Sequence, residues 1–219
     1  MLNQEPTGTA NCHIAWVSET LGREFSDRWA TADDRAYAAE RKRSAATLLA
    51  LAALRALLFA VTGQAGWPLE RAPNGKPSLR HDDGQHAPSV SMSHTPGLIA
   101  VAVALRGSIG VDVERHRPRD FEALADHAFG PTERREIADG GLQAFYRIWT
   151  LREAIAKATG DGLALVLNRA DLADASSGTR PARLYRLFHT MPQPDFSLGV
   201  ALLGGDGYLS PQTVDLAAL

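Results

Sequence analysis

The amino-acid sequence predicts an α+β fold made of two similar α/β halves. Short β-type runs alternate with two long helical stretches, and the apolar run 97–105 is echoed by residues 196–203 about half a chain later. Similarity between segments at such a spacing hints at an internal duplication. The 219 residues suffice for two units of about 110 residues, each able to bury its own core. We therefore expect one half at residues 1–107 and a second at 108–219.

The first half is expected to begin with a strand and to be built around one long helix. Residues 13–17 are typical of a strand, and Thr31-Ala32-Asp33-Asp34 is close to a capping box that starts a helix. Residues 40–61 are mostly good helix formers, and Gly63 ends the run. Its apolar part is shorter than the roughly 20 residues that cross a bilayer and contains Arg55, so we interpret it as a buried helix.

The rest of the chain is expected to form short strands and a second long helix. Residues 66–88 hold so many Pro and Gly residues that they predict a turn-rich connection. Three β-type runs then predict a small meander, and residues 142–159 predict a helix that ends at two glycines, 160 and 162. Two further strands are predicted near the end. The β-type runs are 89–93, 98–105, 108–114, 182–189 and 196–203.

Composition and charge exclude several classes of protein. With 45% apolar and 22% charged residues, the chain is neither collagen-like nor disordered. Its net charge of −2 supplies no field for nucleic acid or an anionic membrane. The single Cys12 cannot form an intrachain disulfide, and the first residues contain neither a basic nor an apolar signal region. We expect a cytoplasmic protein that binds neither nucleic acid nor membrane.

Two carboxylates in the run Ile109–Glu114 are predicted to point to one spot. Successive side chains of a strand alternate between its faces, so Asp112 and Glu114 lie on one face while Val111 and Val113 point into the core. Adjacent carboxylates repel each other, and a hard cation such as Mg²⁺ relieves the repulsion. Since about three such acidic pairs are expected by chance in this composition, the pair alone also fits a coincidence.

The second long helix carries a further acid and a base on one face. Trp149, Glu153 and Lys157 follow one another at four-residue spacing, which places them on one side of a helix. An exposed Glu–Lys pair contributing about 0.3 kcal/mol is the ordinary interpretation. A third carboxylate beside the first two would instead help to fill the six-oxygen shell of Mg²⁺.

Two polar turns could bind phosphate. Lys76 is held in the turn Asn-Gly-Lys-Pro at 74–77, and Ser93, His94 and Thr95 lie where a predicted strand ends. An ammonium group and side-chain donors of this kind suit phosphate oxygens. An ordinary turn and a structural histidine remain the alternatives.

Taken in this order, the motifs resemble the 4′-phosphopantetheinyl transferases, and in particular the Sfp type. The similarity runs from about residue 48 to residue 203. The motifs are Asn-Gly-Lys-Pro at 74–77, Ser-His-Thr at 93–95, Ile-Gly-Val-Asp-Val-Glu at 109–114 and Trp-Thr-Leu-Arg-Glu-Ala-Ile-Ala-Lys at 149–157. The resemblance implies a pseudo-dimer of two α/β halves in one chain, an active site between the halves, and a monomer.

The resemblance also implies a role for each motif residue. Asp112, Glu114 and Glu153 would bind Mg²⁺, with Mn²⁺ as an alternative, on the diphosphate of coenzyme A. Lys157 would face the same diphosphate as a catalytic residue, and Glu153 would also take the proton of the acceptor serine. The residues implied at the nucleotide end of coenzyme A are Thr47, Lys76, Ser93 and His94.

The implied reaction moves the 4′-phosphopantetheine group of coenzyme A to a serine of an acyl or peptidyl carrier protein and releases 3′,5′-adenosine bisphosphate. Carriers of polyketide, non-ribosomal peptide or fatty-acid synthases are the implied partners. We hypothesise that arginines between the two acidic motifs border the carrier: Arg115, Arg117, Arg119, Arg134 and Arg135. The alternative is a degenerate relative that binds coenzyme A without transfer, as a regulatory or assembly subunit. An α+β interaction module without a ligand would need both acidic motifs to be coincidence.

Two positions depart from the family pattern. Arg152 stands where the family usually has Lys, and because arginine cannot accept a proton at neutral pH, a proton relay through this residue is in doubt. Ala46 stands where a basic residue is common, and Arg43 lies one turn earlier.

Overall fold

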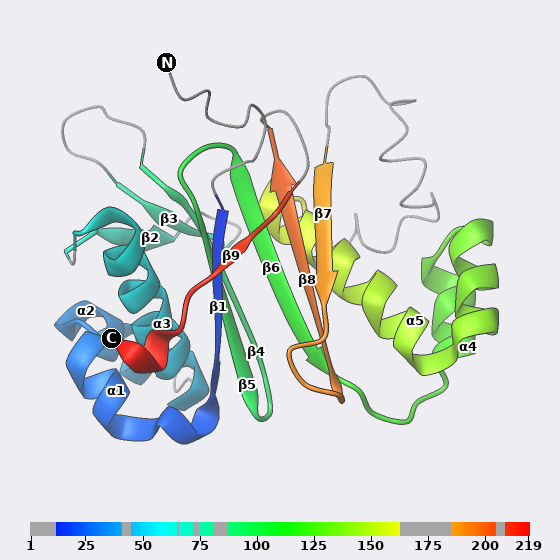
Figure 1. Cartoon of the computed structure of the whole chain (residues 1–219), viewed down its shortest axis with the longest axis horizontal. Helices are drawn as coiled ribbons and strands as arrows, with labels where there is room; N and C mark the ends of the chain where they lie inside the picture. Colours follow the sequence, from blue (N-terminus) through cyan, green and yellow to red (C-terminus); the bar gives the residue numbers. More distant parts are fainter. Residues whose placement is uncertain are drawn as a thin grey trace, which may run out of the picture.

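The structure, a computed structural model, describes residues 12–40, 45–64, 66–71, 75–80, 87–162, 185–204 and 209–219. Two β-sheets lie against each other, and a long helix covers the outer face of each (Figure 1). A two-stranded hairpin forms a third, small sheet. This mixed arrangement confirms the predicted α+β class.

The first sheet has the strand order β4-β5-β1-β9. Strand β5 runs antiparallel to both β1 and β4, whereas β9 adds to β1 in parallel. Val17, Val90 and Val101 on one face of this sheet pack against the helix α3. The elements are β1 (Cys12–Ser18), α3 (Ala45–Thr62), β4 (Ser89–Thr95), β5 (Leu98–Ala104) and β9 (Gln212–Thr213).

The helix α3 confirms the buried helix that the sequence predicts. Within the described residues it is the one helix whose length and composition would also suit a bilayer. However, 61% of it is buried inside the protein, because it packs on β4 and β5. Its predicted first residues, 41–44, lie outside the described residues.

The second sheet repeats the order of the first. It consists of β6 (Ser108–Arg115), β8 (Phe196–Leu203) and β7 (Tyr185–Thr190), with β8 in the centre and antiparallel to both neighbours. The helix α5 (Pro131–Thr159) covers its outer face. In each sheet the chain forms a first strand, then a long helix, then two more strands, of which the last is central. The two echoed runs of the sequence are the central strands β5 and β8.

The core between the two sheets is apolar on both sides. Ala100, Ala102 and Leu98 of the first sheet face Val111 and Val200 of the second, and all are buried. Since alanine side chains are short, the second sheet comes close to β5. The remaining elements are η1 (Glu19–Leu21), α1 (Gly22–Trp29), α2 (Ala32–Glu40), β2 (Leu69–Arg71), β3 (Pro77–Leu79), α4 (Phe121–Ala128) and η2 (Leu216–Ala218).

Several local predictions are confirmed. The helix α2 begins with a reciprocal cap, in which the backbone N–H of Thr31 donates to Asp34 Oδ2 at 3.0 Å and that of Asp34 donates to Thr31 Oγ1 at 3.2 Å. The helix α5 ends at Gly160, which has the left-handed conformation with φ of 78°. The strands predicted at 13–17, 89–93, 98–105, 108–114 and 196–203 are present within a residue or two. The predicted strand 182–189 is described only from Tyr185.

Three local predictions were wrong or incomplete. The three runs between 89 and 114 do not form one meander, because β5 already has β1 and β4 at its two edges and β6 pairs with β8 instead. The helix predicted at 142–159 is present, but a further helical segment from Pro131 precedes it in α5, and the two join at a kink at Gly141, where φ is 61° and ψ is −144°. The turn-rich connection contains the antiparallel strands β2 and β3, which are too short to leave a pattern in the sequence.

Candidate active site

The helix α5 lies very close to the second sheet, so the polar face of this helix lies beside β6. A Cβ atom at Gly110 would overlap the carbonyl oxygen of Ala154, and one at Gly199 would lie 2.6 Å from the carbonyl oxygen of Thr150. Helix backbone therefore lies directly on strand backbone at both glycines, which leaves no room for a larger residue. As a result, Glu153 comes down beside β6.

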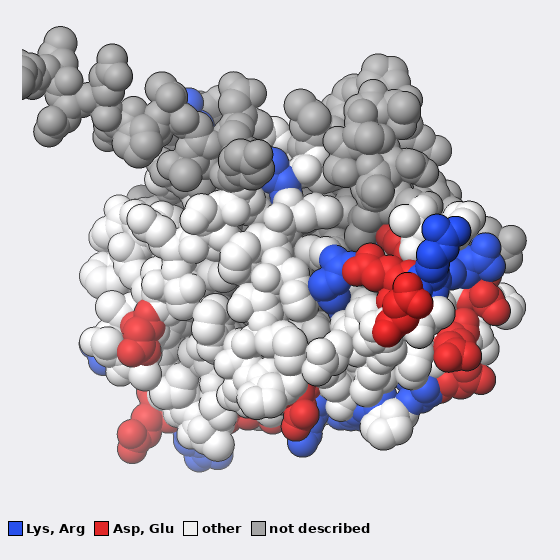
Figure 2. Space-filling view, turned by 45° about the vertical axis from the view of Figure 1, so that its right-hand side comes forward, with Lys and Arg blue, Asp and Glu red and all other residues white. Residues whose placement is uncertain are grey.

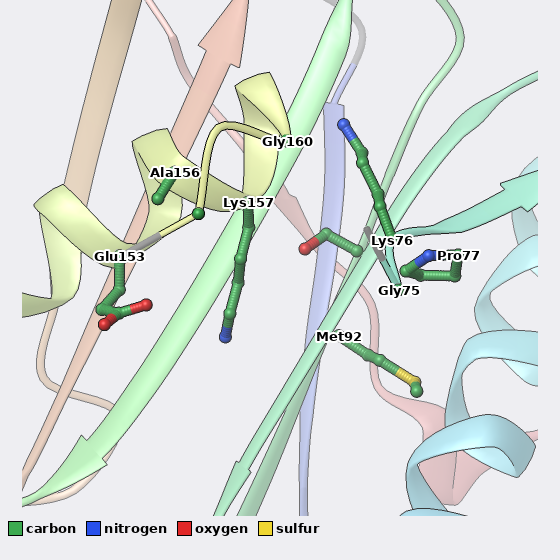
Figure 3. A pocket seen from close by; sticks show the side chains of 10 residues that line it. Gly75, Lys76, Pro77, Met92, Glu153, Ala156, Lys157 and Gly160 are labelled. Carbon is green, nitrogen blue, oxygen red and sulfur yellow. The ribbon is translucent and has the colours of Figure 1, made fainter. Parts of the chain in front are cut away.

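A cavity of about 240 Å³ lies between α5, β4 and the turn before β3. Glu153 and Lys157 extend from α5 on one side, and Lys76 extends into it from the other side (Figure 3). Three residues predicted from two separate motifs therefore line one cavity. The other lining residues are Gly75, Pro77, Ser91, Met92, Ala156, Gly160 and Gly162.

Lys157 joins the cavity to the acidic strand. Its ammonium group donates to Asp112 Oδ1 at 2.7 Å and to Ser93 Oγ at 2.9 Å. Ser93 in turn donates to the same Asp112 oxygen at 2.8 Å. Asp112 is 5% exposed, so this triangle connects β4, β6 and α5 in a place that is largely shielded from water.

The second oxygen of Asp112 has no partner. Its Oδ2 atom is buried and accepts no hydrogen bond, which is costly for a carboxylate. Burial and the charge of Asp112 raise the pKa of Glu114 to about 7, and the same two causes raise the pKa of Glu153. The three carboxylates thus lie near enough to repel one another, which favours a nearby cation.

The donors at this site fit a hard divalent cation. Carboxylate oxygens are the protein ligands that Mg²⁺ prefers, and the unpartnered Asp112 oxygen supplies one that is not engaged by Lys157. Across the described ranges, no three Asp, Glu, His or Cys side chains are grouped closely enough to hold an ion as they stand. The site therefore has the right atoms and the right electrostatics, and its acidic side chains would have to converge on an ion.

Lys76 ties the first part of the chain to the end of α5. Its ammonium group donates to Ser108 Oγ and to the carbonyl oxygen of Ala158, both at 2.7 Å. Ser108 Oγ also donates to that carbonyl at 2.5 Å. Burial lowers the pKa of Lys76. A phosphate in the cavity would meet an ammonium group that is already oriented.

The other predicted nucleotide contacts lie at different distances from the cavity. His94 is exposed on the opposite face of β4 from Ser93, and partial burial together with the charge of Lys157 lowers its pKa. Thr47 is buried in the first turn of α3 and does not line the cavity. Asn74 lies outside the described residues.

Arg152 does not reach the cavity. It is buried and forms an ion pair with Glu133 at 2.5 Å, and its guanidinium lies 5.0 Å from the centre of the Phe129 ring. Arg152 therefore holds the part of α5 after the kink to the start of the same helix, and it does not line the cavity.

Sequence reasoning missed the residues that support the site. Ser91 and Ser108 both bond to neighbouring elements here, and neither belongs to a chemical motif. The signal that could have revealed the first is the alternation of hydroxyl residues at 89, 91, 93 and 95.

Comparison with known proteins finds one superfamily. Residues 108–203 match the family model described as the 4′-phosphopantetheinyl transferase superfamily. The chain is similar to this superfamily over that range. The matched range contains Asp112, Glu114, Glu153 and Lys157, which are the acidic and basic groups of the site described above.

Several curated proteins resemble the chain in part. The 4′-phosphopantetheinyl transferase HetI of Nostoc sp. is 34% identical over 140 residues, which are 59% of this chain and 58% of that protein. The 4′-phosphopantetheinyl transferase AcpT of Salmonella typhi is 39% identical over 75 residues, 32% of this chain and 39% of its own. The 4′-phosphopantetheinyl transferase psf-1 of Bacillus pumilus is 28% identical over 119 residues, 52% of this chain and 49% of its own. The chain spans about half the length of these curated relatives.

The arginines between the acidic motifs do not form a uniformly positive surface. Arg119 lies 5.4 Å from the Tyr146 ring and Arg115 lies 5.8 Å from the Phe196 ring, while Arg134 pairs with Asp126 at 3.3 Å. Figure 2 shows positive and negative side chains intermixed on the side of α4 and α5. Arg119 also stands close enough to Glu114 for its charge to oppose the rise in the Glu114 pKa.

Proposed function

We propose that this protein transfers the 4′-phosphopantetheine group of coenzyme A to a serine of an acyl or peptidyl carrier protein. One observation carries the proposal: a single cavity brings together Lys76, Glu153 and Lys157 beside a buried Asp112 that has an unpartnered oxygen. Two lysines and a group of carboxylates in one cavity suit a diphosphate and its cation. The names of the relatives above support the same activity.

Asp112, Glu114 and Glu153 are proposed to hold Mg²⁺, or Mn²⁺ in its place. When bound, the ion neutralises charge on the diphosphate oxygens of coenzyme A. The support for this assignment is the repulsion among the three carboxylates and the free Asp112 oxygen, both of which a cation relieves.

Lys157 and Lys76 are proposed to bind the two phosphate-bearing parts of coenzyme A. Ser93 and Asp112 orient the Lys157 ammonium beside the cavity, where it would offset charge that develops on the transferred phosphate and the leaving group. Lys76, with Ser93 and His94, would bind phosphate at the nucleotide end. The proposal does not rest on Thr47, since that residue is buried away from the cavity.

Glu153 is proposed to accept the proton of the acceptor serine. The serine oxygen would then bond to the β-phosphorus, and the bond from that phosphorus to the oxygen of 3′,5′-adenosine bisphosphate would break. Burial and the charge of Asp112 raise the pKa of Glu153, whereas a bound cation would lower it, so the proposed role of Glu153 as a base rests on its position in the cavity. The chain's contribution is otherwise to position and neutralise charge.

We also propose that the two sheets belong to two halves of a pseudo-dimer, with the boundary near residue 107. The shared strand order of the sheets and the position of each long helix support this view. One chain would then supply both sides of the cavity, so we expect a monomer. The mixed-charge surface near Arg119 is the proposed border of the carrier protein.

Intact-protein mass spectrometry tests the proposed function. An apo carrier protein is incubated with this protein, coenzyme A and Mg²⁺, and we expect a gain of one phosphopantetheine group on the carrier. EDTA and Asp112→Ala should abolish the gain. Asp126→Ala is the matched control, because Asp126 lies exposed on α4 and pairs with an exposed Arg134.

The outcomes separate the competing functions. Mg²⁺-dependent binding of coenzyme A without transfer to any of several carriers would favour the degenerate relative that acts as a binding subunit. If the protein neither binds coenzyme A nor transfers the group, the result would favour an interaction module. Transfer that persists in EDTA would contradict the assigned role of the carboxylates.

A further inference from the structure

A stripe of hydroxyl groups runs along the face of β4 that points toward the second sheet. Ser89, Ser91, Ser93 and Thr95 alternate with Val90, Met92 and His94, so the hydroxyl residues share one face of the strand. Val90 and Met92 on the other face pack toward α3. In the sheet register the three serines lie opposite alanines of β5 and Thr95 lies opposite Leu98, on the side where β6 approaches.

The stripe bonds to the backbone of β6. Ser89 Oγ accepts a hydrogen bond from the Ile109 N–H at 3.0 Å, and Ser91 Oγ accepts one from the Val111 N–H at 3.0 Å. A longer bond of 3.4 Å follows from the Arg115 N–H to Thr95 Oγ1. In each pair the donor comes 20 residues after the acceptor, so the two strands run in the same direction with a constant offset.

These bonds join two strands that are not neighbours in any sheet. The backbone of β4 pairs with β5, and that of β6 pairs with β8. The hydroxyls therefore take the place of a backbone ladder along the free edge of β6. Without them the N–H groups of that edge would lack acceptors inside the protein.

One hydroxyl of the stripe is used differently. At the same offset Ser93 would face Val113, but its hydroxyl donates to Asp112 Oδ1 and accepts from Lys157. The stripe thus bonds to β6 on both sides of Asp112, and the Ser93 hydroxyl contacts the candidate site.

We infer that Ser91 and Ser89 are positioning residues that fix β6 against β4 and thereby hold Asp112 within reach of Ser93 and Lys157. Val111, which Ser91 binds, directly precedes Asp112 in the chain, so a displacement of β6 moves the carboxylate. Ser91 is 3% exposed, so its hydroxyl is held inside the protein. Small misplacements of a charged group in a site of this kind weaken binding and catalysis strongly. The consequence for catalysis rests on the function proposed above.

Three variants separate a positioning role from a merely structural one. Ser91→Ala removes the acceptor, Ser91→Thr keeps it, and Val90→Ala removes buried contacts from the opposite face of the same strand. Because Ser91 also lines the cavity, Ser89→Ala serves as a fourth variant that weakens the stripe outside the cavity. The first measurement is the Mg²⁺ concentration that gives half-maximal binding of coenzyme A, by calorimetry. The second is kcat and KM in the transfer assay.

Ser91→Ala should raise the Mg²⁺ midpoint by about tenfold and lower kcat more than it changes KM. Ser89→Ala should shift the midpoint in the same direction by a smaller factor, and Ser91→Thr should restore it. Val90→Ala should lower the melting temperature yet leave the midpoint within about twofold of the wild type. A Mg²⁺ midpoint that is the same in Ser91→Ala and in wild type would overturn the inference, as would equal shifts in Ser91→Ala and Val90→Ala.

Amide hydrogen exchange tests the inference even if the protein transfers nothing. In the free protein, Ser91→Ala should accelerate exchange at Val111 and at its neighbours in β6, and Val90→Ala should not do so selectively. Unchanged exchange in β6 would refute the positioning role, whereas inactive wild-type protein with accelerated exchange would refute only the proposed function.

Discussion

The two long helices lie on sheets of the same strand order, but they lie on them differently. The helix α3 rests on side chains such as Val17 and Val101 of the first sheet. The helix α5 rests on the bare backbone of Gly110 and Gly199 in the second sheet. The difference shows how one arrangement can serve two purposes: bulky strand residues give a packed core, and glycines let the helix bring Glu153 down to an acidic strand.

The two helices are nevertheless anchored in the same way. Arg55 of α3 binds both oxygens of Asp34, which also caps α2. Arg152 of α5 binds Glu133, which also accepts a hydrogen bond from the Gly130 N–H at the start of that helix. Arg55 thus ties α3 to the cap of α2, and Arg152 ties the second part of α5 to the cap at the start of the same helix. This kind of anchor is shared by both long helices, whereas the candidate carboxylates and Lys157 lie on the side of α5.

The largest expected effect concerns that chemistry. Glu153→Gln keeps the size of the side chain but removes its charge and its ability to accept a proton, so turnover should fall by about 10²–10⁴-fold while much of the coenzyme A binding remains. The measurement is the rate of phosphopantetheine transfer to a carrier protein. Glu136→Gln, on the exposed side of the same helix, is the matched control and should keep its activity. Full activity of Glu153→Gln would contradict the role of Glu153 as the proton acceptor.

The shared anchors predict similar losses of stability in the two parts of the molecule. Arg55→Met and Arg152→Met each leave a buried carboxylate without its partner, so each should lower the free energy of unfolding by about 3–5 kcal/mol. Urea denaturation measures both. Arg80→Met removes an exposed pair with Glu70 and should cost about 1 kcal/mol or less. A large loss of unfolding free energy in only one of Arg55→Met and Arg152→Met would show that the two anchors are not equivalent.

The glycine contacts predict a smaller loss. Gly199→Ala forces α5 away from β8, because the new Cβ would press on the backbone of Thr150. We expect a loss of about 1–3 kcal/mol in unfolding free energy, together with reduced transfer because Glu153 moves with the helix. Gly66→Ala is the control, since a Cβ at Gly66 meets nothing within 4 Å. Equal stability of the two variants would show that the close approach of α5 does not depend on glycine.

The smallest expected effect is a dependence of stability on pH. Burial and the charges of Arg147 and His116 lower the pKa of His189 from 6.5 to about 4, and its Nε2 atom is buried without a partner. Between these two values the unfolded chain binds a proton at His189 that the folded protein does not, so the contribution of His189 to stability should fall as the pH drops from 6.5 towards 4. The raised pKa values of Glu114 and Glu153 contribute in the opposite direction. Partial exposure of the side chain reduces the size of the effect.

His189→Gln should remove this contribution, so the unfolding free energy of the variant should rise relative to that of the wild type as the pH drops from 6.5 towards 4. His127→Gln, at an exposed position of α4, is the matched control and should leave the curve as it is in the wild type. Curves of the same shape in His189→Gln and in the wild type would assign the pH dependence to other groups.

Local periodicity was sufficient to predict much of the site. Alternation along a strand places Asp112 and Glu114 on one face, and four-residue spacing places Glu153 and Lys157 on one side of a helix, because both patterns depend only on backbone geometry. The structure agrees with both: Val111 and Val113 are in the core, and the two helix residues line one cavity.

The rest depends on contacts between distant segments. Nothing near Lys76 indicates that its ammonium group bonds to Ala158 at the end of α5, and nothing near Arg152 indicates that Glu133 is its partner. The pairing of β6 with β8, in place of β5, follows from which sheet edges are free, and a single sequence does not reveal these edges. Local patterns therefore predicted the candidate site residues, whereas the contacts of each residue depend on how distant segments pack.

The central claim is that one cavity of this chain binds coenzyme A through lysines and a cation held by carboxylates. Calorimetric titration of coenzyme A in Mg²⁺ and in EDTA, with the wild type and Asp112→Asn, tests it most directly. We predict saturable binding by the wild type that Mg²⁺ strengthens at least about tenfold, and no such strengthening in Asp112→Asn. Equal affinity in Mg²⁺ and EDTA for both proteins, or no binding by the wild type, would contradict the claim.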